Sequence, residues 1–262
     1  MKAEIQTFKN VIRETAIYRS NTVASFLVIL VPILFLLVFW NSAFDTVESI
    51  GGYSRNQLFA YYLLVVFLQD VLLIRVNYEI SGDVRSGRLS SYLLRPFGYI
   101  RHCFSVFMAV SSNALLYTGF IVIPILALMS PEFFRLTPAL CIGALSLLLA
   151  SLISFCFGSF FGCISFWFED ISSLQTGLGI FVPILSGAFL PMSFFPGWLK
   201  GLLEVLPFRY SLSFPVEVLS GRIDTFASLN GLIIQVFWVI VGAILLMFTW
   251  SKGKRVYTAY GS

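Results

Sequence analysis

The sequence has very little charge. Only 11% of its 262 residues are Asp, Glu, Lys or Arg, whereas 58% are hydrophobic. Soluble domains carry about 25% charged residues, so this chain has too little charge to cover a water-exposed surface. The composition excludes a soluble enzyme, a disordered tail and a nucleic-acid-binding domain, and it favours a membrane protein with several helical spans. The net charge of +4 then reflects membrane topology rather than contact with nucleic acid.

A nucleotide-binding loop is also missing. The pattern GxxxxGK[ST] holds phosphates through its backbone amides and its lysine. The nearest match covers residues 82–89, where Arg88 replaces the lysine and Leu89 cannot supply the hydroxyl that binds Mg²⁺. We therefore expect no cofactor in this chain. If ATP drives the protein, the ATP and its Mg²⁺ are bound by another chain.

Residue patterns for catalysis or metal binding are scarce. His102 is the single histidine, and neither HExxH nor GxSxG occurs in the sequence. A serine nucleophile needs a nearby base, and none is evident. The four cysteines show no metal-binding spacing. We expect neither an enzyme nor a metal site.

What the sequence does contain is a series of long apolar windows. A helix needs about 20 apolar residues to cross a bilayer core of about 30 Å. The windows that meet or approach this length are residues 22–42, 57–74, 103–129, 139–166, 173–193 and 229–250. Residues 1–20 precede them with apolar residues at helical spacing, which predicts an amphipathic helix along the membrane surface or, alternatively, a solvated segment. The sequence therefore predicts a single all-α membrane domain over residues 1–262, with six transmembrane helices.

Lys and Arg are unevenly distributed between the two sides of this arrangement. With six spans, both termini and the loop 75–102 lie on one side, which holds twelve of the seventeen basic residues. Five of the twelve belong to that loop, namely Arg75, Arg85, Arg88, Arg95 and Arg101. The positive-inside rule places this side in the cytoplasm.

Small residues recur four apart in the window 139–166. They are Ala150, Ser154, Gly158 and Gly162, and they share one helix face, where a second backbone can approach closely. One interpretation is a contact with another subunit. The other is packing within this chain, because every helical bundle needs such faces.

Ionisable residues are almost absent from the windows. Asp70 is the only acid inside one, and it lies near the cytoplasmic end, where it can reach water or pair with Arg75. Ion carriers and channels usually have buried ionisable groups along their pathway. Walls rich in Phe and small residues suit a lipid-like or amphiphilic substrate better than an ion.

Two stretches carry more specific patterns. Between Glu79 and Pro96 the sequence reads E-I-x-G…G-x-L-x-x-Y-L-L-R-P, which predicts a short helix under the membrane. The alternative is a solvated basic loop that only satisfies the topology rule. The second stretch is rich in proline and runs through Gly187-Ala-Phe-Leu-Pro191, Phe195-Pro-Gly-Trp-Leu199 and Leu206-Pro-Phe-Arg-Tyr210 to Pro215 and Gly221.

In their order and position, these stretches resemble the ABC-2 type permeases, and most closely the ABC-2 family transporter protein group. The resemblance covers nearly the whole chain. It implies a second permease chain, identical or different, and a separate ATP-binding subunit in a bacterial plasma membrane, with both termini cytoplasmic. It also implies export of a lipid-like, amphiphilic, peptide or drug substrate. A membrane-embedded anchoring or assembly subunit without transport activity is the alternative.

The resemblance further implies which residues contact the ATPase. In this family the loop between spans 2 and 3 forms a coupling helix that docks on the ATP-binding subunit. The matching positions are Glu79, Gly82, Arg85, Gly87, Arg88, Tyr92, Arg95 and Pro96. The N-terminal helix and the turn at Glu169 and Asp170 are further candidates. Spans 1, 2 and 5 are expected to form the substrate wall. The proline-rich segment after span 5 is expected to form short re-entrant helices, because proline favours broken helices.

Overall fold

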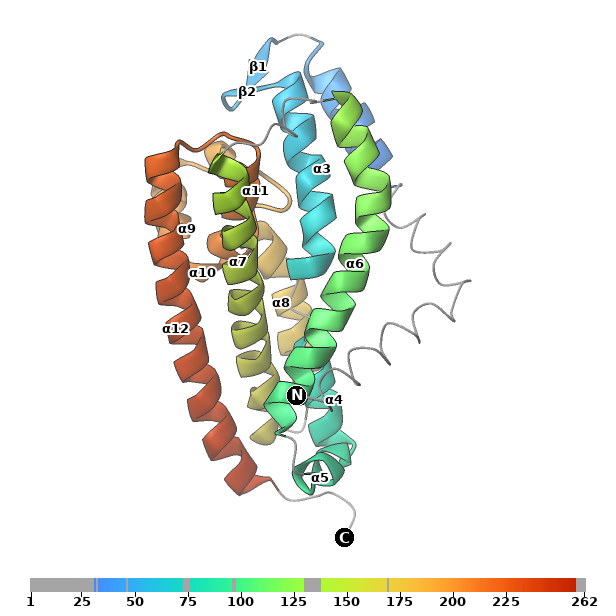
Figure 1. The fold of residues 1–262 in the computed structure, drawn as a ribbon, viewed down its shortest axis with the longest axis vertical. Coiled ribbons are helices and arrows are strands. Elements are labelled where there is room, and N and C mark those ends of the chain that lie inside the picture. The colour runs from blue at the N-terminus through green and yellow to red at the C-terminus, as the bar shows by residue number, and fades with distance from the viewer. Residues whose placement is uncertain are drawn as a thin grey trace.

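The computed structural model describes residues 31, 33–45, 47–72, 76–95, 98–129, 138–168 and 170–257. The predictions for residues 1–20, for residues 22–30 and 32 of span 22–42, and for Arg75, Pro96 and Glu169 lie outside this part, and so does the prediction for the Asp70 side chain. Long helices run side by side along the molecule, with a hairpin at one end and two short helices at the other (Figure 1). We call these the hairpin end and the α4–α5 end.

Three described helices are long and apolar enough to cross a membrane. They cover Tyr99–Met129, which is α6, Leu140–Phe166, which is α7 (Pro138–Cys163) with the short helix η2 (Ile164–Phe166), and Thr225–Val256, which is α12. These are the regions of three predicted spans. Shorter apolar helices cover Ile33–Ala43 and Ser172–Leu185. The all-α membrane fold is thus supported, whereas the count of six spans stays a prediction.

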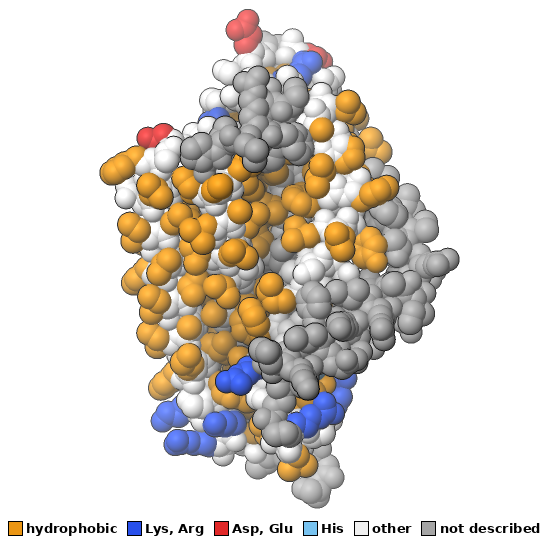
Figure 2. Space-filling model, in the orientation of Figure 1, with side chains coloured by type: hydrophobic (Ala, Val, Ile, Leu, Met, Phe, Trp, Pro, Cys, Tyr) orange, Lys and Arg blue, Asp and Glu red, His pale blue; other side chains and the backbone are white. Residues whose placement is uncertain are grey.

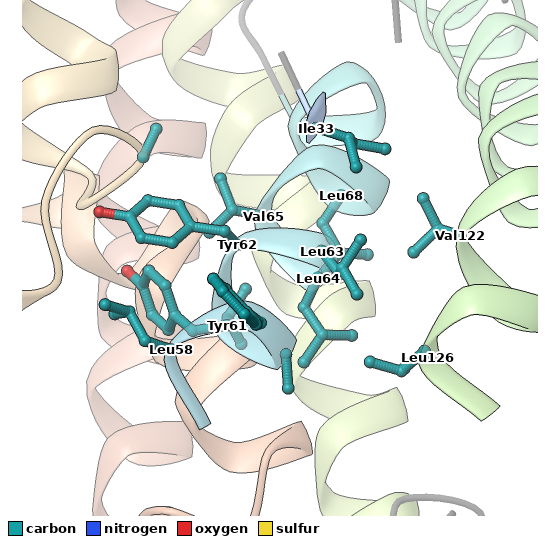
Figure 3. Close-up of a cluster of buried hydrophobic side chains, with 14 of the residues drawn as sticks. Ile33, Leu58, Tyr61, Tyr62, Leu63, Leu64, Val65, Leu68, Val122 and Leu126 are labelled. Atoms are coloured by element: carbon teal, nitrogen blue, oxygen red, sulfur yellow. The ribbon is translucent and has the colours of Figure 1, made fainter. Parts of the chain in front are cut away.

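Helix α3 (Arg55–Leu72) is the most enclosed of the apolar helices. Its side chains from Leu58 to Val65 are all buried, and it packs against α6. Figure 3 shows Leu63 and Leu64 facing Val122 and Leu126 of α6, while the Tyr61 and Tyr62 rings point to the opposite side. Because it is surrounded by protein, α3 tolerates tyrosine in a predicted span.

The predicted span 173–193 is wrong in its second half. Helix α8 (Ser172–Leu185) ends at Leu185, and Gly187 follows with φ +83°, a left-handed conformation that only glycine adopts readily. A Cβ at Gly187 would also lie 2.8 Å from Cβ of Ser213. At 1.5 Å per residue, α8 is about 21 Å long, which is shorter than a bilayer core of about 30 Å. The sequence remains apolar beyond Leu185, but the helical conformation ends there.

Short helices fill the segment after this break, as predicted. They are η3 (Met192–Phe194), α9 (Gly197–Val205), α10 (Pro207–Ser211) and α11 (Ser213–Leu219). Proline opens α10 and directly precedes α9, where no backbone N–H is required. Helices α10 and α11 pack on α7. In Figure 1 all three α-helices lie in the half of the molecule that contains the hairpin. Their depth in the membrane stays a prediction.

Polar contacts tie these short helices to α3 and to the hairpin β1 (Ser49–Ile50) and β2 (Tyr53–Ser54). The hydroxyl of Tyr61 donates to the carbonyl of Gly187 at 2.7 Å, and that of Tyr62 donates to the carbonyl of Phe189 at 2.9 Å. Arg222 donates to the carbonyl of Gly52 at 3.1 Å and lies over the Tyr53 ring. Two carbonyls of the segment that follows α8 are therefore satisfied by tyrosines of α3.

The charges of this segment pair with one another. Arg209 contacts Glu217 at 3.0 Å and Glu204 at 3.3 Å, and the side chains of Arg209 and Glu217 are only 16% and 8% exposed. A buried charge requires such a partner. The pairing explains how a predominantly apolar segment accommodates these residues.

Candidate coupling surface

The helix predicted between Glu79 and Pro96 is present and is split into two. Helix α4 (Val76–Arg85) buries Val76, Ile80 and Val84 at a spacing of four residues. A left-handed Gly87, with φ 72°, separates it from α5 (Arg88–Leu93). Gly87 therefore allows the turn between the two helices. The sequence pattern included this glycine but did not reveal why it is there. A Cβ at Gly82 would meet no atom within 4 Å, so nothing in the structure explains a glycine there.

Helix α4 is held closely against α7. A Cβ at Gly162 of α7 would lie 2.9 Å from Cβ of Ile80 and 3.0 Å from Cα of Asn77. The Ile80 side chain is fully buried at this contact. The backbones of α4 and α7 come close together at Gly162 and Asn77. Even a small separation of the two helices would therefore break this contact.

Asp83 organises the connection from α4 to α5 and α6, although the sequence did not single it out. Its carboxylate accepts a hydrogen bond from Tyr99 at 2.8 Å and pairs with Arg88 at 2.7 Å. The Asp83 side chain is 11% exposed, whereas that of Arg88 is 67% exposed. Arg88 is therefore held by a buried carboxylate, while most of its own side chain remains exposed.

Helix α8 contacts the other side of α4. The Gln175 amide donates to the hydroxyl of Ser81 at 2.7 Å and to the carbonyl of Asn77 at 3.3 Å. The hydroxyl of Tyr78 donates to the carbonyl of Gln175 at 3.4 Å. Gln175 is buried near the start of a predominantly apolar helix, so its amide side chain in an apolar window was the available signal for this contact.

Arg85 and Asp170 form the outer part of the same junction. Their side chains are 3.4 Å apart and both are more than half exposed. The Asp170 carboxylate also accepts hydrogen bonds from the backbone N–H and the hydroxyl of Ser172 at the start of α8. These hydrogen bonds, together with Arg85, lower the pKa of Asp170. Asp170 therefore remains charged and links α4 to α8.

The remaining predicted positions lie around this junction. Tyr92 of α5 packs against the His102 ring at 4.8 Å and carries the Arg95 guanidinium at 4.8 Å from its centroid. Part of the Glu79 side chain reaches the surface, yet desolvation of its carboxyl raises its pKa to about 7. The like charge of Asp83 adds to this rise and Arg88 opposes it. The charge of Glu79 is therefore sensitive to pH near neutrality.

The small-residue ladder lies in the interior of this chain. All four members, Ala150, Ser154, Gly158 and Gly162, are buried within this single chain. Gly162 admits α4, and Ala150 belongs to the buried cluster around α3. These contacts fit the internal-packing interpretation, and the subunit contact stays a prediction.

Among the residues that the structure describes, no group of three His, Cys, Asp or Glu side chains could hold a metal ion. The four cysteines are free thiols, of which only Cys141 is exposed. What the described geometry brings together at this end is a rigid helical junction with exposed arginines.

Comparison with known families identifies this architecture. A family model described as ABC-2 family transporter protein matches residues 30–261. The chain belongs to the ABC-2 family transporter proteins. It is thus the membrane component of a transporter system rather than a catalytic enzyme. No curated protein matches the chain. As a member of the ABC-2 family, it carries its apolar helices as spans of a multi-pass membrane protein.

Proposed function

We propose that this ABC-2 protein is the permease subunit of an ATP-driven exporter in the bacterial plasma membrane. A separate ATP-binding subunit docks on α4 and α5, and a second permease chain completes the path. The substrate is lipid-like, amphiphilic, or a peptide or drug. The single observation that supports this proposal is that α4 is fixed firmly to α7 on its inner side, while Arg85 of α4 and Arg88 of α5 remain exposed.

A continuous set of contacts supports transmission from α4 to the far end of the molecule. Helix α4 contacts the start of α8 through Gln175 and Asp170. At its other end α8 leads to Gly187, whose carbonyl accepts from Tyr61 and whose neighbour Ser186 accepts from the backbone N–H of Ser213. Movement of α4 would therefore displace the short helices that close the hairpin end. ATP would supply the shift by binding more tightly to the closed pair of ATP-binding subunits.

The first test separates partner docking from internal pairing at Arg85. We expect Arg85→Asp to lower ATP-driven transport at least about tenfold, because facing like charges cost several kcal/mol and 1.4 kcal/mol is tenfold. The double variant Arg85→Asp with Asp170→Arg restores the internal ion pair but reverses the surface, so transport should stay low. Transport by the complex in lipid vesicles is measured with a panel of lipids, peptides and drugs.

The control is an equivalent pair at the opposite end. Arg55 and Asp45 lie 3.6 Å apart and are similarly exposed, so their exchange should leave transport unchanged. If the Arg85–Asp170 exchange restored full transport, or if Arg85→Asp had no effect, Arg85 would serve only within the chain and the docking proposal would fail.

A further inference from the structure

The basic residues at the α4–α5 end fall into two groups. Arg85 and Arg88 pair with Asp170 and Asp83. A second group is exposed and pairs with no Asp or Glu of the described residues; it consists of Arg95, Arg101, Lys252, Lys254 and Arg255. Asp170 and Asp83 therefore already neutralise the arginines of the first group. The second group has excess positive charge available for another partner.

Three of the unpaired cations lie near the end of α12, and Lys252 and Arg255 continue rows that begin with exposed apolar residues. Ile244, Phe248 and Lys252 follow one another at intervals of four residues, and the two apolar members are each 61% exposed. Met247, which is 70% exposed, begins a neighbouring row that ends at Arg255. Residues four apart lie one above the other on a helix. The exposed apolar stripe of α12 therefore runs directly into a cationic end.

Figure 2 shows this distribution on one face of the molecule. Hydrophobic side chains cover the left side, where Figure 1 places α12, and Lys and Arg side chains gather below them. The ammonium of Lys252 lies 5.9 Å from the centroid of the Phe248 ring. Long cationic side chains adopt this position where apolar surface meets water, with the stem on the apolar part and the charge beyond it.

The adjacent helix contributes an aromatic neighbour and a further cation. Trp250 of α12 stacks on Tyr99 at the start of α6, with ring centroids 5.3 Å apart. The start of α6 and the last turns of α12 are therefore side by side, and α6 brings exposed Arg101 to the same end. Tryptophan and tyrosine are enriched at the membrane–water interface. The cations thus lie beside an aromatic pair of the kind that is enriched where lipid headgroups begin.

We propose that the end of α12, through Lys252 and Arg255, binds the phosphate of an anionic glycerophospholipid. The acyl chains lie along Ile244, Met247 and Phe248. An anionic lipid fits because its acyl chains match the exposed apolar residues of α12 and its negative headgroup matches the cations that follow them. A soluble protein partner would match the cations but not the exposed apolar stripe that continues from them. The proposal does not depend on ATP or on transport, so its failure is distinguishable from failure of the proposed function.

Binding is tested with the purified full-length chain in a neutral detergent. Phosphatidylglycerol and phosphatidylcholine with identical acyl chains are titrated separately, and bound lipid is counted by native mass spectrometry. We expect tighter binding of phosphatidylglycerol. The double variant Lys252→Gln with Arg255→Gln should weaken that binding about tenfold, because each basic residue near an anionic headgroup contributes and two contributions add. Binding of phosphatidylcholine should not change.

The matched control removes the same amount of charge from the hairpin-end half of the molecule. Arg55→Gln with Lys200→Gln should leave the preference for phosphatidylglycerol unchanged, because both residues already have acidic partners. The proposal is overturned if the two lipids bind equally to the wild type, or if both double variants lose the same affinity. It is also overturned if the α12 variant keeps its lipid preference and instead loses an ATP-binding partner protein.

Discussion

Replacing Arg209 with methionine is expected to lower the free energy of unfolding by about 3–5 kcal/mol, the usual effect of breaking a buried ion pair from one side. Glu217 would then remain buried without its partner, since its side chain is only 8% exposed and Arg209 lies 3.0 Å away. Methionine retains much of the arginine volume, so the loss would come from charge rather than from a cavity. Thermal unfolding in detergent measures it, with a thiol-reactive dye that reports exposure of the buried Cys103, Cys156 and Cys163.

A double variant separates the charge effect from the packing effect. Arg209→Met with Glu217→Leu removes both charges and should recover most of the lost stability, because replacing both members of a buried pair by apolar groups is often neutral. Lys200→Gln is the control at the exposed pair with Glu204, 3.9 Å away, and should change stability by less than about 1 kcal/mol. A double variant less stable than the single one would contradict the account of a paired, buried network.

The second large effect is expected at the contact between α7 and α4. Gly162→Ala should destabilise the protein by about 1–3 kcal/mol through overpacking, because the new Cβ would meet Ile80 and the backbone of Asn77 at about 3 Å. It should also lower transport, since α4 would be displaced from α7. Unfolding temperature and transport are measured on the same preparation.

Gly82→Ala is the matched control, since it adds the same methyl group to α4 where no atom lies within 4 Å. Alanine is the better helix former, so this variant should be as stable as the wild type or more stable by about 0.5–1 kcal/mol. Equal stability of the Gly162 and Gly82 variants would show that α4 is not held against α7 as described.

The long helices could be predicted because length and composition alone determine them. The windows 103–129, 139–166 and 229–250 fall within the apolar helices α6, α7 with η2, and α12. The end of α8 could not be predicted in this way, because the apolar run continues through residue 190 while the backbone turns at Gly187. That turn depends on Tyr61 and Ser213, which come from distant parts of the chain.

The candidate site was predicted in position but not in its internal contacts. The pattern between Glu79 and Pro96 located the helices α4 and α5, and the resemblance supplied the role that we propose for them. Asp83 and Gln175 were missed because their importance comes from Tyr99 and Ser81, whose proximity only the fold creates. The small-residue ladder showed the same limit, since spacing indicates a close approach but does not identify the partner.

Capture of partner proteins tests most directly whether this ABC-2 protein works with an ATP-binding subunit through α4 and α5. The tagged full-length chain is purified from gently solubilised membranes of the cells that make it, and bound proteins are identified by mass spectrometry. We expect the wild type to retain a protein containing GxxxxGK[ST], Arg85→Asp to retain at least about tenfold less of it, and Arg55→Asp to retain as much as the wild type. If the wild type retains no such protein, or if Arg85→Asp retains the same amount, the proposed coupling is contradicted.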